Sequence, residues 1–189
     1  MQQERKEFAE AIKEIDIFKL VPLDESSVNL AFSRNYGRAL TTERIKEGRE
    51  DVRFERESIL STFRLNGDMC PLVFSGTLNK ELFAAYIKTQ LKPTLADDDI
   101  LLLDNSSVHR SKLVVDTLNE CGIKVLWLPR YSPDYNPIEL LWSYMKSVLR
   151  KLKARTHEKL EEAINFALDS VPLDYIKHWF EHCGYSVNL

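Results

Sequence analysis

The sequence predicts an α/β fold in which a mixed sheet is flanked by helices. Extended apolar segments and a hairpin come first, helix and strand then alternate, and three helices close the chain. Apolar residues make up 44% of the 189 residues, which is enough for one well-buried core. No repeat or low-complexity linker divides the chain, so residues 1–189 are predicted to form a single domain.

Periodicity places the elements in order along the chain. Apolar residues at helical spacing indicate the helices, and short apolar runs indicate the strands. The predicted elements are a helix at 8–17, a strand at 18–23 with extended chain at 28–32, strands at 58–65 and 69–74, a helix at 79–91, a strand at 100–104, a helix at 111–121, a strand at 123–128, and helices at 137–153, 156–171 and 172–183.

Turn residues separate these elements. The Asn66-Gly67 pair is a strong hairpin signal between the second and third strands. Gly122 is placed to end a helix in the left-handed conformation. Residues 41–57 carry many charges of both signs and few apolar side chains, so an exposed loop or hairpin is expected there.

Composition excludes several classes of protein. No apolar run approaches the roughly 20 residues of a membrane span, so no membrane partner is expected. Three scattered cysteines, Cys70, Cys121 and Cys183, indicate reduced thiols and an intracellular location. The net charge of -3 argues against a surface uniformly adapted to nucleic acid.

Two acids suggest a metal site. Asp104 closes the apolar run at 100–103, so it is expected at the carboxyl end of a buried strand, where ligands collect in open α/β sheets. Glu139 lies just inside a helix opened by Asn136 and Pro137, and the two acids could share a cation. Each has a structural alternative. Asp104 could begin a turn, and Glu139 could complete a capping box with Asn136 as N-cap.

The helix that carries Glu139 also carries basic residues. Between residues 124 and 155 there are seven basic residues and two acids. At 100° per residue, Lys146, Arg150 and Lys153 project toward the same side as Glu139. The opposite side is expected to face the core and carries Leu141, Met145, Val148 and Leu152. This basic stripe beside candidate metal ligands suits a phosphate backbone.

Asp24 is ambiguous from its own surroundings. It lies in an early strand, and on its own it is interpreted as an exposed acid on an edge strand. Because strand side chains alternate, Asp24 and Glu25 are expected on opposite faces of the sheet.

Several strings together resemble the catalytic core of mariner-superfamily transposases, specifically the bacterial insertion-sequence branch. They are LDN at 103–105 with His109, and LPRYSPDYNPIELLW at 128–142, with 34 residues between Asp104 and Glu139. LDES at 23–26, followed by YGRA at 36–39, resembles the segment with the family's first aspartate. HCGY at 182–185 resembles the family's ending.

This resemblance implies an RNase H-like fold, a five-stranded mixed sheet with helices, here with extra C-terminal helices. It implies that Asp24, Asp104 and Glu139 hold two Mg²⁺ or Mn²⁺ ions for DNA strand cleavage and strand transfer by in-line displacement at phosphorus. Asn105, His109 and Asn136 would support the metal ligands or contact DNA. The phosphate-binding residues would be Arg130, Lys146, Arg150 and Lys153.

The implied partners are the DNA of the element ends and of the target, with a homodimer in the DNA complex and a cytoplasmic, nucleoid-associated location. Since 23 residues precede Asp24, a separate helix-turn-helix polypeptide is expected to read the ends. A catalytically silent remnant that serves as an interaction module is an alternative. An RNase H-like nuclease without transfer activity is another. A zinc site at His178, His182 and Cys183 is disfavoured because a fourth ligand is lacking.

Overall fold

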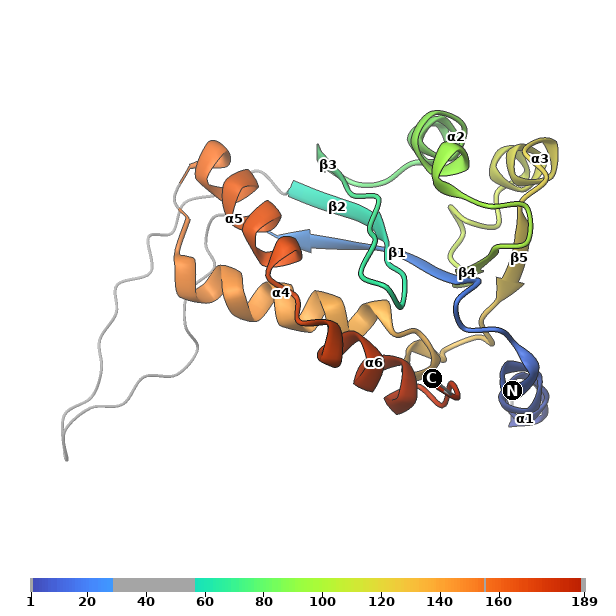
Figure 1. Cartoon of the computed structure of the whole chain (residues 1–189). Coiled ribbons are helices and arrows are strands. Elements are labelled where there is room, and N and C mark those ends of the chain that lie inside the picture. The colour runs from blue at the N-terminus through green and yellow to red at the C-terminus, as the bar shows by residue number, and fades with distance from the viewer. Residues whose placement is uncertain (1, 29–56, 155, 188–189) are drawn as a thin grey trace.

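The computed structural model describes residues 2–28, 57–154 and 156–187. Its centre is a five-stranded sheet with the strand order β3-β2-β1-β4-β5 (Figure 1). The strands are β1 (Leu20–Val28), β2 (Glu57–Thr62), β3 (Leu72–Ser75), β4 (Ile100–Leu103) and β5 (Lys124–Trp127). β1 pairs antiparallel with β2 and parallel with β4, so the sheet is mixed and the predicted fold class is confirmed.

Helices cover both faces of the sheet. They are α1 (Gln2–Ala11), α2 (Lys80–Tyr86), α3 (Lys112–Glu120), α4 (Ile138–Leu152), α5 (His157–Asp169) and α6 (Leu173–His182). In Figure 1, α2 and α3 lie on one side of the sheet, whereas α4 and α6 lie on the other. The C-terminal helices α5 and α6 follow the last strand, as the sequence predicts.

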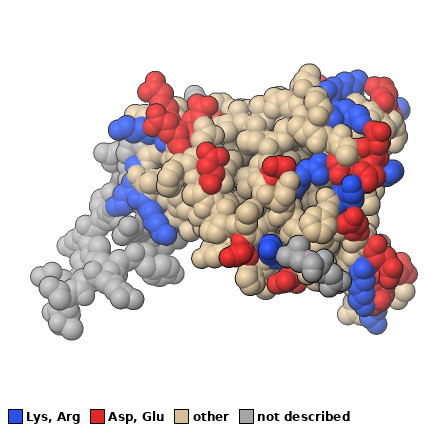
Figure 2. Space-filling model, in the orientation of Figure 1, with Lys and Arg blue, Asp and Glu red and all other residues tan. Residues whose placement is uncertain are grey.

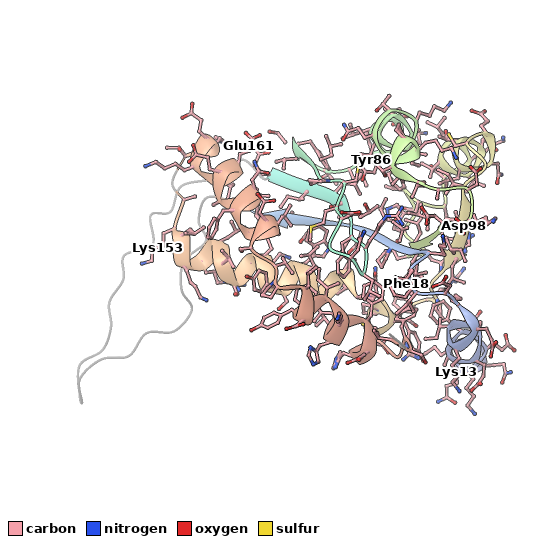
Figure 3. The ribbon with its side chains drawn as sticks, viewed as in Figure 1. Lys13, Phe18, Tyr86, Asp98, Lys153 and Glu161 are labelled. Atoms are coloured by element: carbon pink, nitrogen blue, oxygen red, sulfur yellow. The ribbon has the colours of Figure 1, made fainter. Side chains whose placement is uncertain are left out.

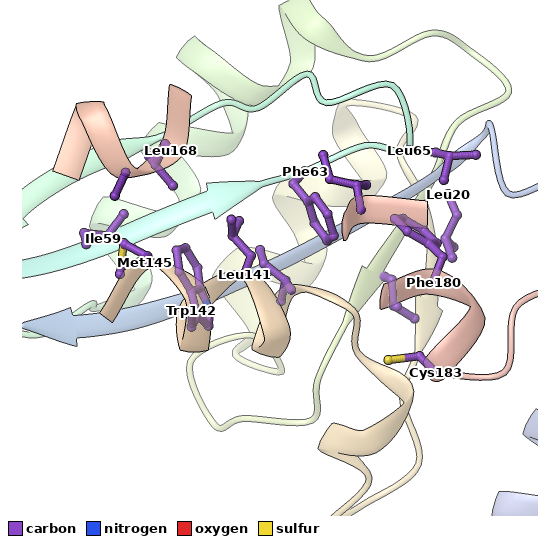
Figure 4. Packing of buried hydrophobic residues seen from close by; sticks show 14 of the residues in the cluster. Leu20, Ile59, Phe63, Leu65, Leu141, Trp142, Met145, Leu168, Phe180 and Cys183 are labelled. Atoms are coloured by element: carbon purple, nitrogen blue, oxygen red, sulfur yellow. The ribbon is translucent and has the colours of Figure 1, made fainter. Parts of the chain in front are cut away.

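Each face of the sheet has its own hydrophobic cluster, because the side chains of β1 alternate. Leu20 packs in a cluster with α4, α5 and α6, where Trp142 and Phe180 are buried (Figure 4). Leu23 packs in the other cluster, with α2 and α3. Burial of apolar side chains on both faces holds the central strand rigidly, and that strand carries Asp24.

The predicted turn at Asn66-Gly67 is confirmed. The Gly67 N–H donates to the Arg64 carbonyl at 2.9 Å, and Gly67 has a φ of +93°, which favours glycine. A Cβ at Gly67 would also approach Leu173 Cδ2 to 2.9 Å. The regular pairing of the hairpin is shorter than predicted, because it ends at Leu60 and Leu72, and among the described residues one isolated bridge, Phe63 to Met69, lies nearer the turn.

The first predicted helix begins and ends earlier than expected. The helix predicted at 8–17 spans Gln2–Ala11, and a 3₁₀ turn follows it. The Asp16 side chain accepts the N–H of Phe18 at 3.0 Å, and this local turn competes with helix continuation. Residues 29–32 of the predicted extended chain and 41–56 of the predicted loop or hairpin lie outside the described residues, whereas Val28 ends β1 and Glu57 begins β2.

A buried ion pair ties the β2–β3 hairpin to the start of β4. Arg64 donates to both oxygens of Asp99, at 3.1 and 2.5 Å, and Asp99 also accepts the Ala96 N–H at 2.7 Å. Burial alone would raise the pKa of Asp99, but these hydrogen bonds outweigh it and lower the pKa below its usual range. This carboxylate therefore stabilises the fold above its unfolded pKa of about 3.9, and that stabilisation is lost as the pH falls toward the folded pKa.

Asp99→Asn is expected to lower the free energy of unfolding by about 3 kcal/mol near neutral pH, since it breaks a buried pair. The loss should begin to shrink below about pH 4, where the unfolded carboxyl takes up a proton, and should shrink further as the pH approaches the lower pKa of folded Asp99. Urea unfolding of wild type and variant, near neutral pH and well below about pH 4, measures the loss of unfolding free energy. Asp98→Asn is the matched control, because Asp98 pairs with Lys19 at 2.8 Å on the surface and should change stability little. An equal loss at both pH values would contradict the assignment.

Candidate active site

A cleft of about 1090 Å³ opens where β4 and β5 end. Asp24, Asp104 and Glu139 all line it, although they come from a strand, a strand end and a helix. This is the carboxyl edge of a parallel strand pair, the usual ligand position in open α/β sheets. The structure therefore brings all three predicted acids to one cleft.

Strand register explains how Asp24 meets Asp104. Parallel pairing aligns Pro22 of β1 with Leu102 of β4. Two residues further along each strand stand Asp24 and Asp104, so the same alignment places them side by side where β4 ends. β1 is the middle strand of the sheet, so the interpretation of Asp24 as an acid on an edge strand is wrong.

Asp24 faces α4. The indole N–H of Trp142 donates to Asp24 Oδ2 at 3.2 Å. Burial, together with the nearby negative charges of Glu25, Glu139 and Asp104, raises the pKa of Asp24 to about 8. Trp142 is a core residue, and it also orients a candidate ligand.

Asp104 is held by its own loop. Asp104 Oδ1 accepts the N–H of Ser106 at 2.9 Å and lies 2.6 Å from Nδ1 of His109. Burial alone would raise the pKa of Asp104, but these hydrogen bonds lower it overall, so the carboxylate form is favoured. Both contacts end on Oδ1, and neither uses Oδ2.

Glu139 does not form the capping box that its spacing allows. The N–H of Asn136 donates to the Pro133 carbonyl at 2.9 Å, within a 3₁₀ turn, so it cannot donate to Glu139. The helix that begins at Ile138 has no side-chain cap. Burial raises the pKa of Glu139, and the positive charge of Lys146 opposes this effect. The Glu139 carboxyl is thus free of the structural role that its position suggests.

Three polar residues were predicted to support the site or contact DNA. Asn105 donates to the Leu128 carbonyl and accepts from Arg110 Nε at 2.6 Å, so both ends of its amide bind protein groups. His109 is fully buried; burial lowers its pKa, but Asp104 and Glu25 outweigh this and raise the pKa to about 9. Asn136 Oδ1 lines the cleft region as a buried acceptor without a hydrogen-bond partner among the described residues.

The predicted basic stripe is only partly brought to the cleft. Arg130 lines it, and Lys146 is close enough to act on Glu139. Arg150 lies eleven residues beyond Glu139 on α4, about 16 Å along the helix axis. Lys153 has a φ of +52° just after the helix ends, so the helical projection does not apply to it. Leu152, predicted as core, is 47% exposed at the last position of α4.

Figures 2 and 3 show the charged side chains at two opposite ends of the molecule. Lys153 lies at one end of the molecule and Lys13, just after α1, lies at the other (Figure 3). Basic side chains gather over the end of α4 that is remote from α1, whereas α1 carries both signs of charge (Figure 2). The described basic residues therefore include a group at the C-terminal end of α4, remote from α1.

Sequence reasoning missed an arginine and two aromatic residues of the cleft wall. The Arg110 guanidinium lies 3.6 Å from the ring centroid of Trp127. Tyr131 is 89% exposed and has a φ of +54°, an uncommon conformation for a bulky residue. The alternation of aromatic and basic residues at Trp127, Arg130 and Tyr131 was the available signal for a nucleic-acid surface.

Helix α1 closes one side of the cleft. Glu4, Glu7, Phe8 and Ala11 contribute to the lining. Arg5 fastens the helix to the loop before α4, because it donates to Asp134 at 2.6 Å and to Ser132 Oγ at 2.7 Å. This docking holds α1 against the loop that carries Arg130 and Tyr131.

The three acids fit a divalent cation in chemical type. Carboxylate oxygens are the ligands that Mg²⁺ and Mn²⁺ prefer, and the mutual repulsion that raises the pKa of Asp24 would be relieved by a cation. Within residues 2–28, 57–154 and 156–187, no three His, Cys, Asp or Glu side chains are arranged to hold one ion. A shared ion therefore requires side-chain rotation, first of Asp24, whose Oδ2 is engaged by Trp142.

The histidines of α6 do not assemble a comparable cluster. His178 Nδ1 lies 2.5 Å from the Asp174 carbonyl oxygen, one turn earlier. Cys183 is buried in the core, and burial raises the pKa of its thiol to about 12.

Among the helices that the structure describes, none has the length and apolar character to cross a membrane.

Known proteins resemble the chain in both sequence and fold. The Tcb1 transposase of Caenorhabditis briggsae is 23% identical over 110 residues, which is 56% of this chain and 40% of that protein. The structure of a Mos1 transposase paired-end complex with the left transposon end has a TM-score of 0.79 at 15% identity, covering 96% of this chain and 57% of that chain. The Mos1 mariner transposase catalytic domain has a TM-score of 0.72 at 15% identity, covering 97% and 86%.

The fold of the described residues is thus that of the Mos1 catalytic domain, an RNase H-like fold. The chain spans about half the length of the Tcb1 and Mos1 transposase chains that it resembles. The family model for DDE superfamily endonucleases matches residues 19–162, a segment that includes all three acids of the cleft. The chain therefore belongs to the DDE superfamily endonuclease family.

Proposed function

We propose that this chain is the catalytic domain of a mariner-superfamily transposase of the bacterial insertion-sequence branch, which cleaves and transfers DNA strands with two Mg²⁺ or Mn²⁺ ions. The observation that carries the proposal is the meeting of Asp24, Asp104 and Glu139 in one cleft. Family membership supports the reaction class, and the string at 128–142 supports the branch. Mos1 structures with Mn and with Mg support the choice of metal.

Asp24, Asp104 and Glu139 would hold the ions, with Asp24 shared between both. When bound, divalent ions supply activation of the attacking oxygen and stabilisation of the leaving oxygen in an in-line displacement. The protein contributes orientation. Trp142 orients Asp24, and Ser106 together with His109 orients Asp104. α1 and the 128–136 loop both line the cleft, and Arg5 of α1 holds the two together through Asp134.

DNA would bind along the basic and aromatic wall of the cleft. Arg110 and Arg130 provide positive charge for backbone phosphates beside the three acids. Lys146 and Arg150 would continue these phosphate contacts along α4, and Lys153 would end them. Tyr131 presents an exposed ring at the rim, on which a base can stack. That Mos1 structures are complexes with transposon ends supports DNA as the partner.

Tyr131→Ala is expected to weaken binding of a short DNA duplex with a frayed end by about 1–3 kcal/mol, the usual contribution of one stacked base. Fluorescence anisotropy with labelled DNA at fixed salt measures the affinity. Tyr131→Phe keeps the ring and should bind as the wild type does. Tyr175→Ala removes an exposed ring from α6, outside the cleft lining, and is the matched control. Equal affinity of Tyr131→Ala and wild type would contradict the stacking role.

The assembly stays a prediction. A homodimer in the DNA complex, a separate helix-turn-helix polypeptide and a cytoplasmic, nucleoid-associated location follow from the family resemblance. So does the assignment of residues 1–189 to one catalytic domain. The chain covers 40% of the length of Tcb1 and 57% of the length of the Mos1 chain. The activity of a whole transposase is therefore a proposal, made by analogy with the catalytic part of those proteins.

A plasmid assay in Mn²⁺ tests the proposed activity. Wild type should nick supercoiled DNA and join pre-cut 3′ ends to target DNA, and Glu139→Gln should do neither. Nicking without joining would indicate an RNase H-like nuclease without transfer activity. Absence of both reactions in wild type would indicate a catalytically silent remnant that acts as an interaction module.

A further inference from the structure

A fourth acid, Glu25, lies behind the three that line the cleft. Glu25 follows Asp24 in β1, so the two side chains leave the strand on opposite faces. Asp24 meets Trp142 of α4, whereas Glu25 pairs across the sheet with Leu60, a residue of the cluster under α2 and α3. The alternation expected from the sequence therefore holds. Glu25 reaches the site from the face that is turned away from α4.

His109 connects Glu25 to Asp104. Its Nδ1 lies 2.6 Å from Asp104 Oδ1, and its Nε2 lies 3.4 Å from Glu25 Oε2. The ring has no solvent exposure and packs against Phe83 of α2, with 4.8 Å between ring centroids. One imidazole thus spans two carboxylates that come from different strands and from opposite sides of the site.

Among the described residues, Glu25 is the polar group that contacts the far side of the ring. His109 Nε2 and Glu25 Oε2 are both buried and lie 3.4 Å apart, and neither makes a hydrogen bond within the described residues. In the part of the chain that the structure describes, no lysine or arginine pairs with Glu25. A buried polar atom without a partner costs free energy, so each of these two atoms favours the other.

This arrangement restrains Asp104. Phe83 limits the tilt of the ring, and Glu25 limits its rotation about the Cβ–Cγ bond, so Nδ1 is aimed at Asp104 Oδ1. The contacts of His109 and Ser106 both end on Oδ1, which leaves Oδ2 as the oxygen that can face a cation. Groups that hold a metal ligand in this way commonly control metal affinity by 10–100-fold, as an order of magnitude.

We propose that Glu25 is a positioning residue that acts through His109 to hold Asp104 in the orientation needed for a divalent cation. The proposal rests on the proposed function, since it assumes that Asp104 is a metal ligand. Glu25 itself touches neither substrate nor metal in this arrangement. Its expected effect is on the affinity for the metal.

Isothermal titration of the full chain with Mn²⁺ tests the proposal. Glu25→Met keeps an unbranched side chain but removes both oxygens, and it should weaken Mn²⁺ binding about tenfold. Glu25→Gln can still hydrogen-bond to His109 Nε2 and should retain most of the affinity. If Glu25 acted on the ion only through its charge, Gln and Met would weaken binding equally, and that result would overturn the positioning role.

A double-mutant cycle shows whether the effect passes through His109. In His109→Asn the amide nitrogen lies two bonds from Cβ, as Nδ1 does, so it can donate to Asp104 but cannot reach Glu25. Glu25→Met should therefore cause no further loss in the His109→Asn background. Losses that simply multiply would show that Glu25 acts independently of His109 and would overturn the proposal.

Glu57→Gln is the matched control, because Glu57 forms a carboxylate–imidazole contact with His157 at 2.9 Å outside the cleft. It should bind Mn²⁺ as the wild type does. Thermal unfolding without metal completes the test. If Glu25→Met lowers the unfolding temperature but leaves the Mn²⁺ affinity unchanged, the role of Glu25 is structural. That result would overturn this inference and leave the proposed function standing. Wild type that binds no Mn²⁺, or Asp104→Asn that binds as well as wild type, would overturn the proposed function itself.

Discussion

Asp104→Asn is expected to reduce Mn²⁺-dependent nicking of DNA by at least about a thousandfold. A bound cation contributes several kcal/mol of transition-state stabilisation, and about 4 kcal/mol corresponds to this factor. The variant keeps the shape of the side chain and an oxygen that can accept from the Ser106 N–H, so the loop should hold its conformation. Single-turnover nicking rates at saturating Mn²⁺ measure the loss of the chemical step.

Asp116→Asn provides the matched control for this prediction. Asp116 is an acid on α3 that pairs with Lys112 at 2.5 Å and does not line the cleft. Its removal should leave the nicking rate unchanged. A nicking rate for Asp104→Asn within a few-fold of the wild-type rate would mean that Asp104 does not hold the reacting metal.

Phe180→Ala is expected to lower the free energy of unfolding by about 3–5 kcal/mol, through lost burial and a residual cavity. Phe180 has no solvent exposure and packs against Phe63, with 5.4 Å between ring centroids, and against Tyr185 at 5.9 Å (Figure 4). These contacts join α6 to the β2–β3 hairpin. Urea denaturation followed by far-UV circular dichroism measures the loss.

The control for Phe180 is a phenylalanine on the neighbouring helix α5. Phe166 is 57% exposed, so Phe166→Ala should change the free energy of unfolding by no more than about 0.5 kcal/mol. Similar losses for the two substitutions would show that burial does not determine their effect. In that case the packing of α6 against the hairpin would not be the main support of this end of the core.

Local patterns in the sequence predicted the elements well, because their causes are local. The apolar run at Ile100–Leu103 forms β4, and Asp104 follows it at the edge of the sheet. Long-range pairing was harder to predict. Nothing near Asp24 indicates that β1 lies in the middle of the sheet, since that follows from its pairing with a strand about 80 residues away. The family resemblance, rather than residue patterns, identified Asp24 as a candidate ligand.

The errors at the site also have physical causes. The capping box at Glu139 failed because a 3₁₀ turn, Pro133–Tyr135, already satisfies the Asn136 N–H. Helical spacing in the sequence predicted that the basic stripe extends to Lys153, but α4 ends at Leu152. Strand alternation correctly separated Asp24 from Glu25. It did not show that an imidazole from the β4–α3 loop would reconnect Glu25 to Asp104 from the other face.

Anomalous scattering from crystals soaked in Mn²⁺ tests the convergence of the three acids most directly. The expected result is two peaks in the cleft, one between Asp24 and Asp104 and one between Asp24 and Glu139, with Asp24 turned away from Trp142. A cleft without an anomalous peak at saturating Mn²⁺, in which Asp24 keeps its hydrogen bond to Trp142, would contradict a metal-dependent mechanism at these residues.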